Sequence, residues 1–303
     1  MNNALAHPAI DPSATPMEPT PAVQKADERR PVSELVLPLD TPPIHIETEV
    51  DVDGMARLLA HTERVWTQLG DSEPHWSVIS AERFRQNELD AHRSEFYDSG
   101  RGDVHTFNAF LARNGVDASG LRKVLEYGCG LGRVTRFLAA QFAAVEAFDI
   151  SPSHLRQAEE HLARSGLSNV ELKRVRALDD IGRAVDLDAV FCVIVLQHNP
   201  PPVIVAVLQR LLARLRPGGV AYFQVPTHAT EYSFKVDNYL AHGLGANHVE
   251  MHYVPQRRIF EIAHQAHCQV LEVREDDWVG RREVELSNTF LLRKAVNDKV
   301  PQA

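Results

Sequence analysis

Apolar residues first show a regular spacing about fifty residues into the chain. Between Met55 and Leu69 they recur at separations of three, four and seven residues, which is the pattern of one buried helical face. Similar helical patterns cover about residues 80–98 and 103–114. The sequence therefore predicts a helical lead-in before the central part of the chain.

The pattern changes at Lys123 to short apolar runs that alternate with amphipathic helices. The helix after Asp149 has start signals, because Ser151 can cap it and Pro152 suits its first turn. Gly218 and Gly219 are available for a left-handed cap after a later helix. The expected strands are 123–127, 144–149, 170–175, 188–195 and 219–225, and the expected helices are 132–142, 152–165 and 201–215.

The last third of the chain reads as a helix at 255–267 followed by strands at 268–275 and 288–294. Strands that alternate with helices indicate a parallel sheet covered on both faces. We therefore predict an α/β fold: a Rossmann-like, mostly parallel seven-stranded sheet with helices on both faces. The helical lead-in precedes this sheet, and a C-terminal antiparallel hairpin ends it.

The distribution of proline predicts the domain boundaries. Nine of the 18 prolines fall in the first 43 residues, in a segment with neither helical nor strand periodicity. We predict a disordered tail over residues 1–45, a helical cap over 46–118 and one domain over 119–303. Residues 227–254 form a long connection within that domain, and a connection of this length is typical of a functional insertion.

Composition narrows the classes of function. Asp and Glu outnumber Lys and Arg by 41 to 32, which disfavours nucleic acid as a partner. The three cysteines show neither a disulfide framework nor a zinc-binding spacing, and no apolar stretch is long enough to span a membrane. These features predict a cytoplasmic protein with no membrane span, and they leave its oligomeric state open.

A glycine-rich loop carries the main candidate chemistry. Gly128, Gly130 and Gly132 follow the strand 123–127 and lead into a helix. Glycines at such a position let the backbone approach a ligand closely. The spacing GxGxG differs from the dinucleotide fingerprint GxGxxG, and Glu126 stands two positions before the first glycine. A carboxylate there disfavours a pyrophosphate and favours a ligand with an ammonium or sulfonium charge.

The segment EYGCGLG resembles motif I of the class I S-adenosylmethionine-dependent methyltransferases. The resemblance covers about residues 121–225, because FDIS, DAVFCVIVLQH and LRPGG follow in the order of that family. It implies S-adenosyl-L-methionine as the cofactor, with S-adenosyl-L-homocysteine as the product. It also implies that Asp149 accepts hydrogen bonds from the ribose hydroxyls, and that Ile150, Leu178 and Asp179 lie near the rest of the nucleoside.

Two further residues of the loop region are cofactor-site candidates. Tyr127 either lines the cofactor pocket or packs beneath the loop, and the pattern does not separate these alternatives. Arg133 either pairs with the carboxylate of the methyl donor or is a solvated surface arginine. Cys129 is expected to fill space, since methyl transfer from a sulfonium needs no covalent enzyme intermediate.

The acceptor side is marked by histidines. His198 ends the expected fourth strand, where the carboxyl ends of parallel strands form a ligand crevice. His248, Glu250 and His252 alternate as on a strand and would face one side together. We predict His198, His252 and Glu250 as the catalytic candidates, one of them removing a proton from the acceptor, and we predict no metal.

The acceptor itself is predicted from a second, less specific resemblance. Parts of the lead-in, VLQHNPPP and VEMHYVPQ resemble methyltransferases that accompany glycosyltransferases in bacterial polysaccharide biosynthesis. This implies O-methylation of a hydroxyl on a sugar or polysaccharide-related acceptor. The alternatives are a methyltransferase of another small molecule, a non-catalytic S-adenosylmethionine-binding module and an NAD-dependent oxidoreductase.

Overall fold

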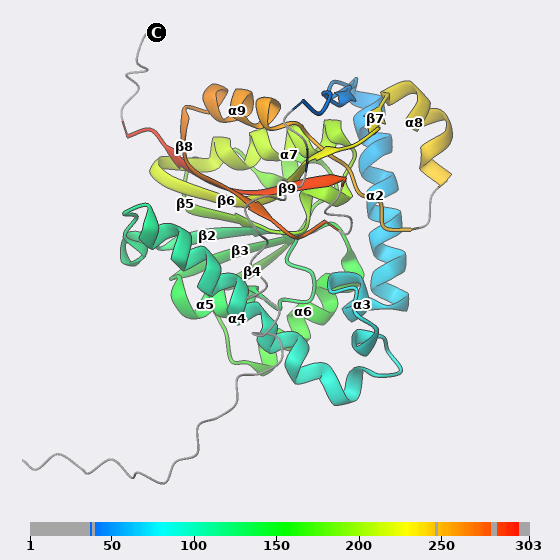
Figure 1. Ribbon diagram of the computed structural model, residues 1–303. Helices are drawn as coiled ribbons and strands as arrows, with labels where there is room; N and C mark the ends of the chain where they lie inside the picture. Colours follow the sequence, from blue (N-terminus) through cyan, green and yellow to red (C-terminus); the bar gives the residue numbers. More distant parts are fainter. Residues whose placement is uncertain (1–36, 38–39, 246–247, 280–283, 297–303) are drawn as a thin grey trace, which may run out of the picture. The chain divides into compact units, whose positions relative to one another are not determined.

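The computed structural model describes residues 37, 40–245, 248–279 and 284–296. The predicted tail over residues 1–45 lies mostly outside these residues. A seven-stranded sheet occupies the centre, with the strand order β4-β3-β2-β5-β6-β9-β8 (Figure 1). Its strands are β2 (Lys123–Tyr127), β3 (Ala144–Asp149), β4 (Val170–Arg174), β5 (Leu187–Cys192), β6 (Leu215–Ala229), β8 (Cys268–Asp276) and β9 (Glu285–Lys294).

The five strands from β2 to β6 are parallel to their neighbours, and β9 pairs antiparallel with both β6 and β8. This confirms the predicted mostly parallel sheet and its C-terminal antiparallel hairpin. A second, two-stranded sheet was not predicted: β1 (His45–Ile46) pairs in parallel with β7 (Ser233–Phe234).

Helices cover both faces of the large sheet, as predicted. The longer ones are α2 (Val52–Ser72), α4 (Leu89–Arg113), α6 (Pro152–Arg164), α7 (Pro201–Arg214) and α9 (Gln256–Gln265). The shorter ones are α3 (Pro74–Val78), α5 (Thr135–Gln141) and α8 (Val236–His242). Single 3₁₀ turns are η1 (Glu82–Phe84), η2 (Ala118–Gly120), η3 (Leu178–Ile181), η4 (Leu196–His198) and η5 (Gly243–Gly245).

Alternation along the strands distributes the core between the two faces. On β2, Leu125 packs with the side chains of α7 and α9, whereas Val124 packs with those of α4 and α5. Consecutive residues of a strand point to opposite faces, so an apolar run is buried twice. Helices α7 and α9 therefore lie over one face and α4 and α5 over the other (Figure 1).

The lead-in is helical as predicted, but its helices differ in extent. Residues 89–113 form one continuous helix, α4, where two separate patterns were predicted. Gly100 lies inside this helix, and a Cβ atom there would come within 2.2 Å of the carbonyl oxygen of Arg133. Gly100 thus allows close packing of α4 on the loop after β2 and does not end the helix.

Two boundaries between elements were also predicted incorrectly. Strand β5 ends at Cys192 and not at residue 195, because Ile194 has a positive φ of 58°. Helix α7 ends at Arg214, and Leu215 is already extended. Gly218, with φ of 81°, therefore belongs to the irregular start of β6 and does not cap the helix.

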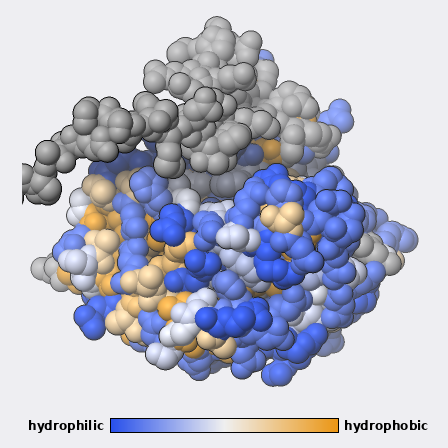
Figure 2. Space-filling model, turned by 90° about the horizontal axis from the view of Figure 1, so that it is seen from below, coloured by the Kyte–Doolittle hydropathy of each residue, from blue (hydrophilic) through white to orange (hydrophobic). Residues whose placement is uncertain are grey.

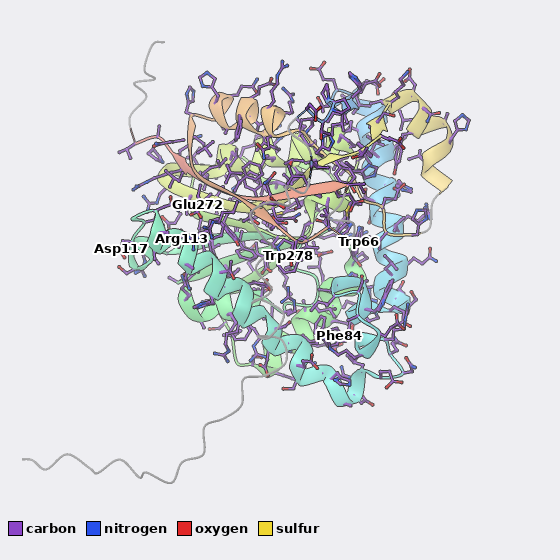
Figure 3. The ribbon with its side chains drawn as sticks, in the orientation of Figure 1. Trp66, Phe84, Arg113, Asp117, Glu272 and Trp278 are labelled. Carbon is purple, nitrogen blue, oxygen red and sulfur yellow. The ribbon has the colours of Figure 1, made fainter. Side chains whose placement is uncertain are left out.

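The end of α4 is fixed to the outer strand of the sheet. Arg113 donates to Glu272 of β8 at 2.8 Å, and Asn114 donates to the other carboxylate oxygen at 2.5 Å (Figure 3).

On the face seen in Figure 2, hydrophobic residues gather on one half and hydrophilic residues on the other. Large exposed hydrophobic side chains come from separate segments: Val52, Val185, Phe260, Trp278 and Val296.

No helix in the described part of the chain is both long and apolar enough to cross a membrane.

A buried ion-pair cluster lies at the end of the sheet opposite the carboxyl ends. Arg214, 4% exposed, donates to Glu146 at 2.6 Å and to Asp186 at 2.6 Å. Lys123 also pairs with Glu146 at 2.8 Å. Burial alone would raise the pKa of Glu146, but Arg214 and Lys123 lower it to about 2, so the carboxylate is charged at neutral pH.

Replacing Arg214 by alanine is expected to lower the free energy of unfolding by about 3 kcal/mol, because the buried Glu146 loses its main partner. Urea unfolding followed by circular dichroism measures this change. Arg183→Ala is the matched control: Arg183 is 75% exposed and pairs with the 66% exposed Asp179. The control is expected to change stability by less than about 0.5 kcal/mol. Equal effects of the two substitutions would contradict this description.

Candidate functional site

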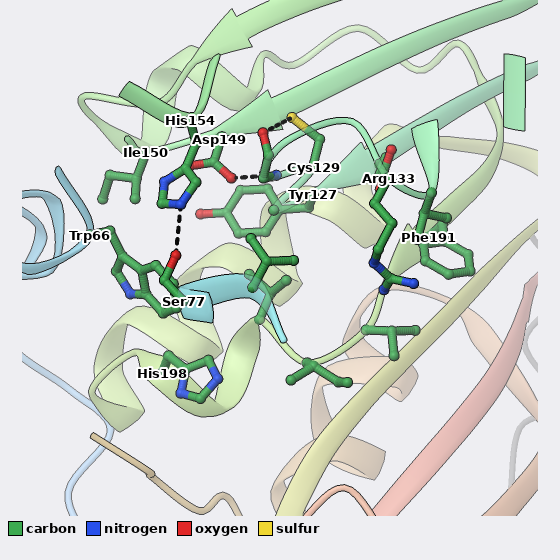
Figure 4. A pocket seen from close by; sticks show the side chains of 18 of the residues that line it. Trp66, Ser77, Tyr127, Cys129, Arg133, Asp149, Ile150, His154, Phe191 and His198 are labelled. Carbon is green, nitrogen blue, oxygen red and sulfur yellow. Dashed lines mark hydrogen bonds between the residues drawn. The ribbon is translucent and has the colours of Figure 1, made fainter. Parts of the chain in front are cut away.

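A cavity lies at the carboxyl ends of β2, β3 and β5, where the parallel strands give way to loops. Helices of the lead-in form its other wall, with Thr62 and Trp66 from α2 and Ser77 and Val78 from α3 (Figure 4). The residues from the strands, their loops and neighbouring helices are Asp103, Glu126, Tyr127, Gly128, Cys129, Gly130, Arg133, Val134, Asp149, Ile150, His154, Phe191, Val193, Ile194, Val195, His198 and Asn199.

The glycine loop approaches the cavity with its backbone. Gly128 and Gly130 have φ of 79° and 52°, which side-chain-bearing residues rarely adopt. A Cβ atom on Gly128 would lie 2.2 Å from Val195, and one on Gly130 would lie 3.0 Å from Val78. A side chain at either position would therefore occupy space at the cavity wall. Gly132, with φ of 77°, follows in the same loop but does not line the cavity.

Asp149 holds this loop to the end of β3. Its Oδ2 accepts from the Gly130 N–H at 2.8 Å (Figure 4). Its Oδ1 accepts from the Ser151 N–H at 2.8 Å. The carboxylate thus fixes the loop conformation and also faces the cavity. Each carboxylate oxygen can accept more than one hydrogen bond, so acceptor capacity remains for a ligand with hydroxyl groups.

Glu126 is a buried acid in the wall of the cavity. It is 3% exposed, and its Oε2 accepts from the Thr135 hydroxyl at 2.6 Å. Burial raises the pKa of Glu126 to about 8, although the hydrogen bond from Thr135 opposes this shift. The acid is therefore mostly neutral at pH 7, and a cationic group bound in the cavity would favour its ionised form.

Arg133 pairs with the lead-in. Its Nη1 donates to Asp103 of α4 at 2.5 Å and to Ser99 at 3.2 Å. Its Nε is buried and has no hydrogen-bond partner. The prediction left open whether Arg133 is a solvated surface residue; the structure instead places it in the cavity wall with one donor unused.

Tyr127 and Ile150 also line the cavity, and Tyr127 is 6% exposed. Cys129 is 4% exposed, and burial raises its pKa, so the thiol stays protonated. Leu178 and Asp179 do not line the cavity. Asp179 instead pairs with Arg210 of α7 at 2.8 Å and with Arg183 at 3.2 Å, which turns its carboxylate toward the helix α7.

His198 lies across the cavity from the glycine loop (Figure 4). It belongs to η4 and not to the end of a strand, since β5 stops at Cys192. The ring packs at 5.4 Å from that of Trp66, and Nδ1 lies 2.9 Å from the carbonyl oxygen of Glu250. Burial lowers the pKa of His198 to about 4, so the imidazole is neutral at pH 7.

Glu250 and His252 lie behind His198 and do not line the cavity. Residues 248–252 do not form a strand, so the predicted alternation is absent. Glu250 and His252 nevertheless approach each other, at 3.8 Å between Oε2 and Nε2. His252 is 5% exposed, and its Nδ1 lies 2.9 Å from the Tyr232 hydroxyl.

The Glu250 carboxylate joins the insertion to α2. Its Oε2 accepts from the Tyr239 hydroxyl of α8 and lies 3.3 Å from Nε2 of His61. Burial alone would raise the pKa of Glu250, but His252, Tyr239 and His61 lower it to about 2. Glu250 is therefore a charged anchor. Among the described residues, no group of three His, Cys, Asp or Glu side chains could hold a metal ion.

Sequence reasoning missed the cavity residues that the lead-in supplies. Thr62 and Trp66 belong to a helix whose periodicity predicted only core packing, and Ser77 and Val78 lie between the predicted helical patterns. His154 was also missed, although its Nε2 lies 2.9 Å from the Ser77 hydroxyl (Figure 4). No short motif marks these residues, because contacts between distant helices bring them to the cavity.

Comparison with known proteins identifies a domain in the middle of the chain. Residues 124–219, which include the glycine loop, Asp149 and His198, match the model of a methyltransferase domain. Residues 124–219 therefore form a methyltransferase domain of the class I S-adenosylmethionine-dependent type. This confirms the resemblance seen in the glycine loop and in the motifs that follow it along the chain.

Curated relatives are also methyltransferases. The chain is 32% identical over 150 residues to the ubiquinone biosynthesis O-methyltransferase of Xylella fastidiosa strain 9a5c, covering 46% of this chain and 58% of the relative. It is 36% identical over 104 residues to the protein of that name from Thiobacillus denitrificans, covering 34% of this chain and 43% of the relative. The chain therefore spans well under two thirds of the length of these relatives.

Magnesium protoporphyrin IX methyltransferase (ChlM) from Synechocystis PCC 6803 with bound S-adenosylmethionine has the same fold. It superposes with a TM-score of 0.53 at 16% identity, covering 82% of this chain and 100% of that chain. At this identity the similarity concerns the fold alone.

Proposed function

We propose that this chain transfers a methyl group from S-adenosylmethionine to a hydroxyl group of a small molecule. One observation carries the proposal: a single cavity joins the glycine loop and Asp149 on one side to a neutral, partly buried histidine on the other. The names of the relatives, which are O-methyltransferases, support oxygen as the methylated atom.

The residues around the glycine loop fit S-adenosylmethionine. Gly128 and Gly130 line the cavity with bare backbone, which would let the methionine part approach closely, and Asp149 would accept from its ribose hydroxyls. Arg133 has a buried unused donor that suits a carboxylate, and Glu126 suits an ammonium group. We retain as the cofactor site Glu126, Tyr127, Gly128, Gly130, Arg133, Asp149 and Ile150. We leave out Gly132, Leu178 and Asp179, which do not line the cavity.

His198 is the proposed general base. When bound, S-adenosylmethionine supplies an electrophilic methyl group and leaves as S-adenosylhomocysteine. The acceptor oxygen forms its new bond to carbon and must lose a proton. A neutral imidazole can take that proton at its unprotonated nitrogen. His198 lines the cavity and is neutral at pH 7, whereas Glu250 and His252 do not line the cavity.

The identity of the acceptor is a finer question. The sugar or polysaccharide acceptor predicted from sequence has no support from the relatives, which are named for ubiquinone biosynthesis. Trp66 packs against His198 in the cavity wall, and Val195 also lines the cavity, which favours an acceptor with an apolar face. A saccharide acceptor stays a prediction and belongs in the same assay as phenolic acceptors.

Two experiments on the purified protein test the proposal. Calorimetric titration with S-adenosylhomocysteine is expected to show binding, and titration with NADH is expected to show none. Release of S-adenosylhomocysteine is then measured over saccharides, catechols and hydroxylated apolar compounds. Binding of NADH alone would support an oxidoreductase. Binding of S-adenosylhomocysteine without turnover of any acceptor would indicate a non-catalytic binding module.

A further inference from the structure

Gln224 is a fully buried polar residue of β6 that has no place in the cofactor site. It is 0% exposed and lies behind the wall of the cavity. Its side chain makes three hydrogen bonds, to the Ile194 N–H at 3.0 Å, the Gln197 side chain at 2.9 Å and the Ser287 hydroxyl at 2.7 Å. A buried amide with all of these partners fixes the groups around it.

The first of these contacts supports a strained backbone. Ile194 has a φ of 58°, which is rare for a residue branched at Cβ, and it lines the cavity. Such conformations persist only where the surroundings impose them, and they cluster at functional sites. Gln224 satisfies the Ile194 N–H in this conformation, and the turn that follows carries Gln197 and His198.

The direction of each hydrogen bond follows from the backbone groups at the two ends of the chain of contacts. The Ile194 N–H can only donate, so Oε1 of Gln224 faces it and Nε2 of Gln224 donates to Oε1 of Gln197. The Nε2 of Gln197 is therefore the atom that faces Nε2 of His198, at 3.3 Å. That nitrogen of His198 receives a donor and carries no proton of its own.

The other side of the ring gives the same answer independently. Nδ1 of His198 lies 2.9 Å from the carbonyl oxygen of Glu250, and a carbonyl can only accept. Nδ1 therefore carries the proton. The backbone of this segment is held in place because the His252 N–H donates to the Gln197 carbonyl at 2.7 Å and Tyr239 donates to the Glu250 carboxylate.

We propose that Gln197 and Gln224 are positioning residues that hold His198 as the neutral tautomer with its lone pair at Nε2. The inference rests on the proposed function, in which His198 is the base. A fixed tautomer matters because only the unprotonated nitrogen can accept the acceptor's proton. The acceptor hydroxyl would displace the long 3.3 Å contact of Gln197 and donate to the Nε2 lone pair in its place. Glu250 contributes through its backbone carbonyl, so it is also a positioning residue and not a catalytic one.

The Gln197→Glu variant tests the proposal, because it places an acceptor where Nε2 of His198 now receives a donor. In the wild type, ¹⁵N NMR of histidine-labelled protein at pH 7 is expected to show a pyridine-like Nε2 and a pyrrole-like Nδ1 for His198. In the variant, Nε2 is expected to become pyrrole-like. The acid limb of kcat should move to higher pH, with the affinity for S-adenosylhomocysteine unchanged.

Gln256→Glu is the matched control. Gln256 donates to Asn288 at 2.7 Å and has no contact with this chain of hydrogen bonds, so its variant should leave the His198 spectrum and the pH profile unchanged. If the Gln197 variant does not fold, Gln224→Met is used in its place. It keeps the side-chain volume and removes the hydrogen bonds of Gln224 to Ile194 and Gln197. That variant should show partial conversion of His198 to the other tautomer.

A pyrrole-like Nε2 in the wild type, or an unchanged spectrum in the variants, would overturn the proposal. These spectra are measured without an acceptor. The expected spectra in a protein that turns over no acceptor would therefore uphold the positioning role and refute only the proposed function.

Discussion

Replacing His198 by alanine is expected to lower kcat by about 10²–10⁴-fold, because the acceptor hydroxyl loses the group that takes its proton. His198 lines the cavity, and its ring is neutral at pH 7. The other two histidines predicted for the acceptor side, His248 and His252, do not line the cavity. The affinity for S-adenosylhomocysteine should stay nearly unchanged. Steady-state kinetics with a confirmed acceptor and calorimetry on the same preparation measure both quantities.

His252→Ala is the comparison for this variant. His252 contacts Tyr232 and Glu250 but does not reach the cavity, so its loss should lower kcat much less. Near-wild-type rates for a folded His198→Ala protein would remove His198 from the chemistry. Proximity of the acceptor to the methyl group would then have to account for the rate.

The pH dependence of the wild-type rate gives a separate check on the base. A histidine at its ordinary pKa would lose activity below about pH 6.5. Burial lowers the pKa of His198 to about 4, so the neutral base persists to lower pH. The rate should be constant from pH 8 to pH 6 and should fall as the pH drops through about 4. His198→Ala should lose this limb.

Replacing Asp149 by alanine is expected to weaken binding of S-adenosylhomocysteine about tenfold or more. The carboxylate accepts hydrogen bonds from the Gly130 and Ser151 amides. In our proposal it also accepts hydrogen bonds from the ribose hydroxyls. Charge-assisted hydrogen bonds of this kind are worth about 1.5–3 kcal/mol each, so losing even one costs about a factor of ten in affinity. Calorimetric titration at pH 7 measures the change.

Asp180→Ala is the matched control for Asp149→Ala. Asp180 also accepts from backbone amides, at Arg176 and Ala177, but it lies outside the cavity. The control should leave the affinity for S-adenosylhomocysteine unchanged. Unchanged affinity in a folded Asp149→Ala protein would show that this carboxylate only shapes the loop.

The fold and the glycine loop could be predicted because their signals are local. The loop follows its strand directly, and Asp149 ends the next strand, so both lie at the same edge of a parallel sheet. The left-handed Ile194 could not be predicted in this way. It depends on Gln224, which is thirty residues away and reaches it only because β5 and β6 are adjacent.

The acceptor side shows the same limit. Alternation suggested that Glu250 and His252 lie on one face of a strand with His248, yet the segment is not a strand and His248 is exposed. What brings Glu250 and His252 near His198 is the packing of α2 and α8 around them, through His61 and Tyr239. Such contacts between distant helices leave no pattern in the sequence.

The central claim is methyl transfer to oxygen, and the fate of a labelled methyl group tests it most directly. The protein is incubated at pH 7 with S-adenosylmethionine bearing a trideuteriomethyl group and with the hydroxylated acceptors named above. Mass spectrometry with fragmentation should find one labelled methyl group on an acceptor oxygen and an equal amount of S-adenosylhomocysteine. Label on carbon or nitrogen, or no labelled product from a protein that binds S-adenosylhomocysteine, would contradict the claim.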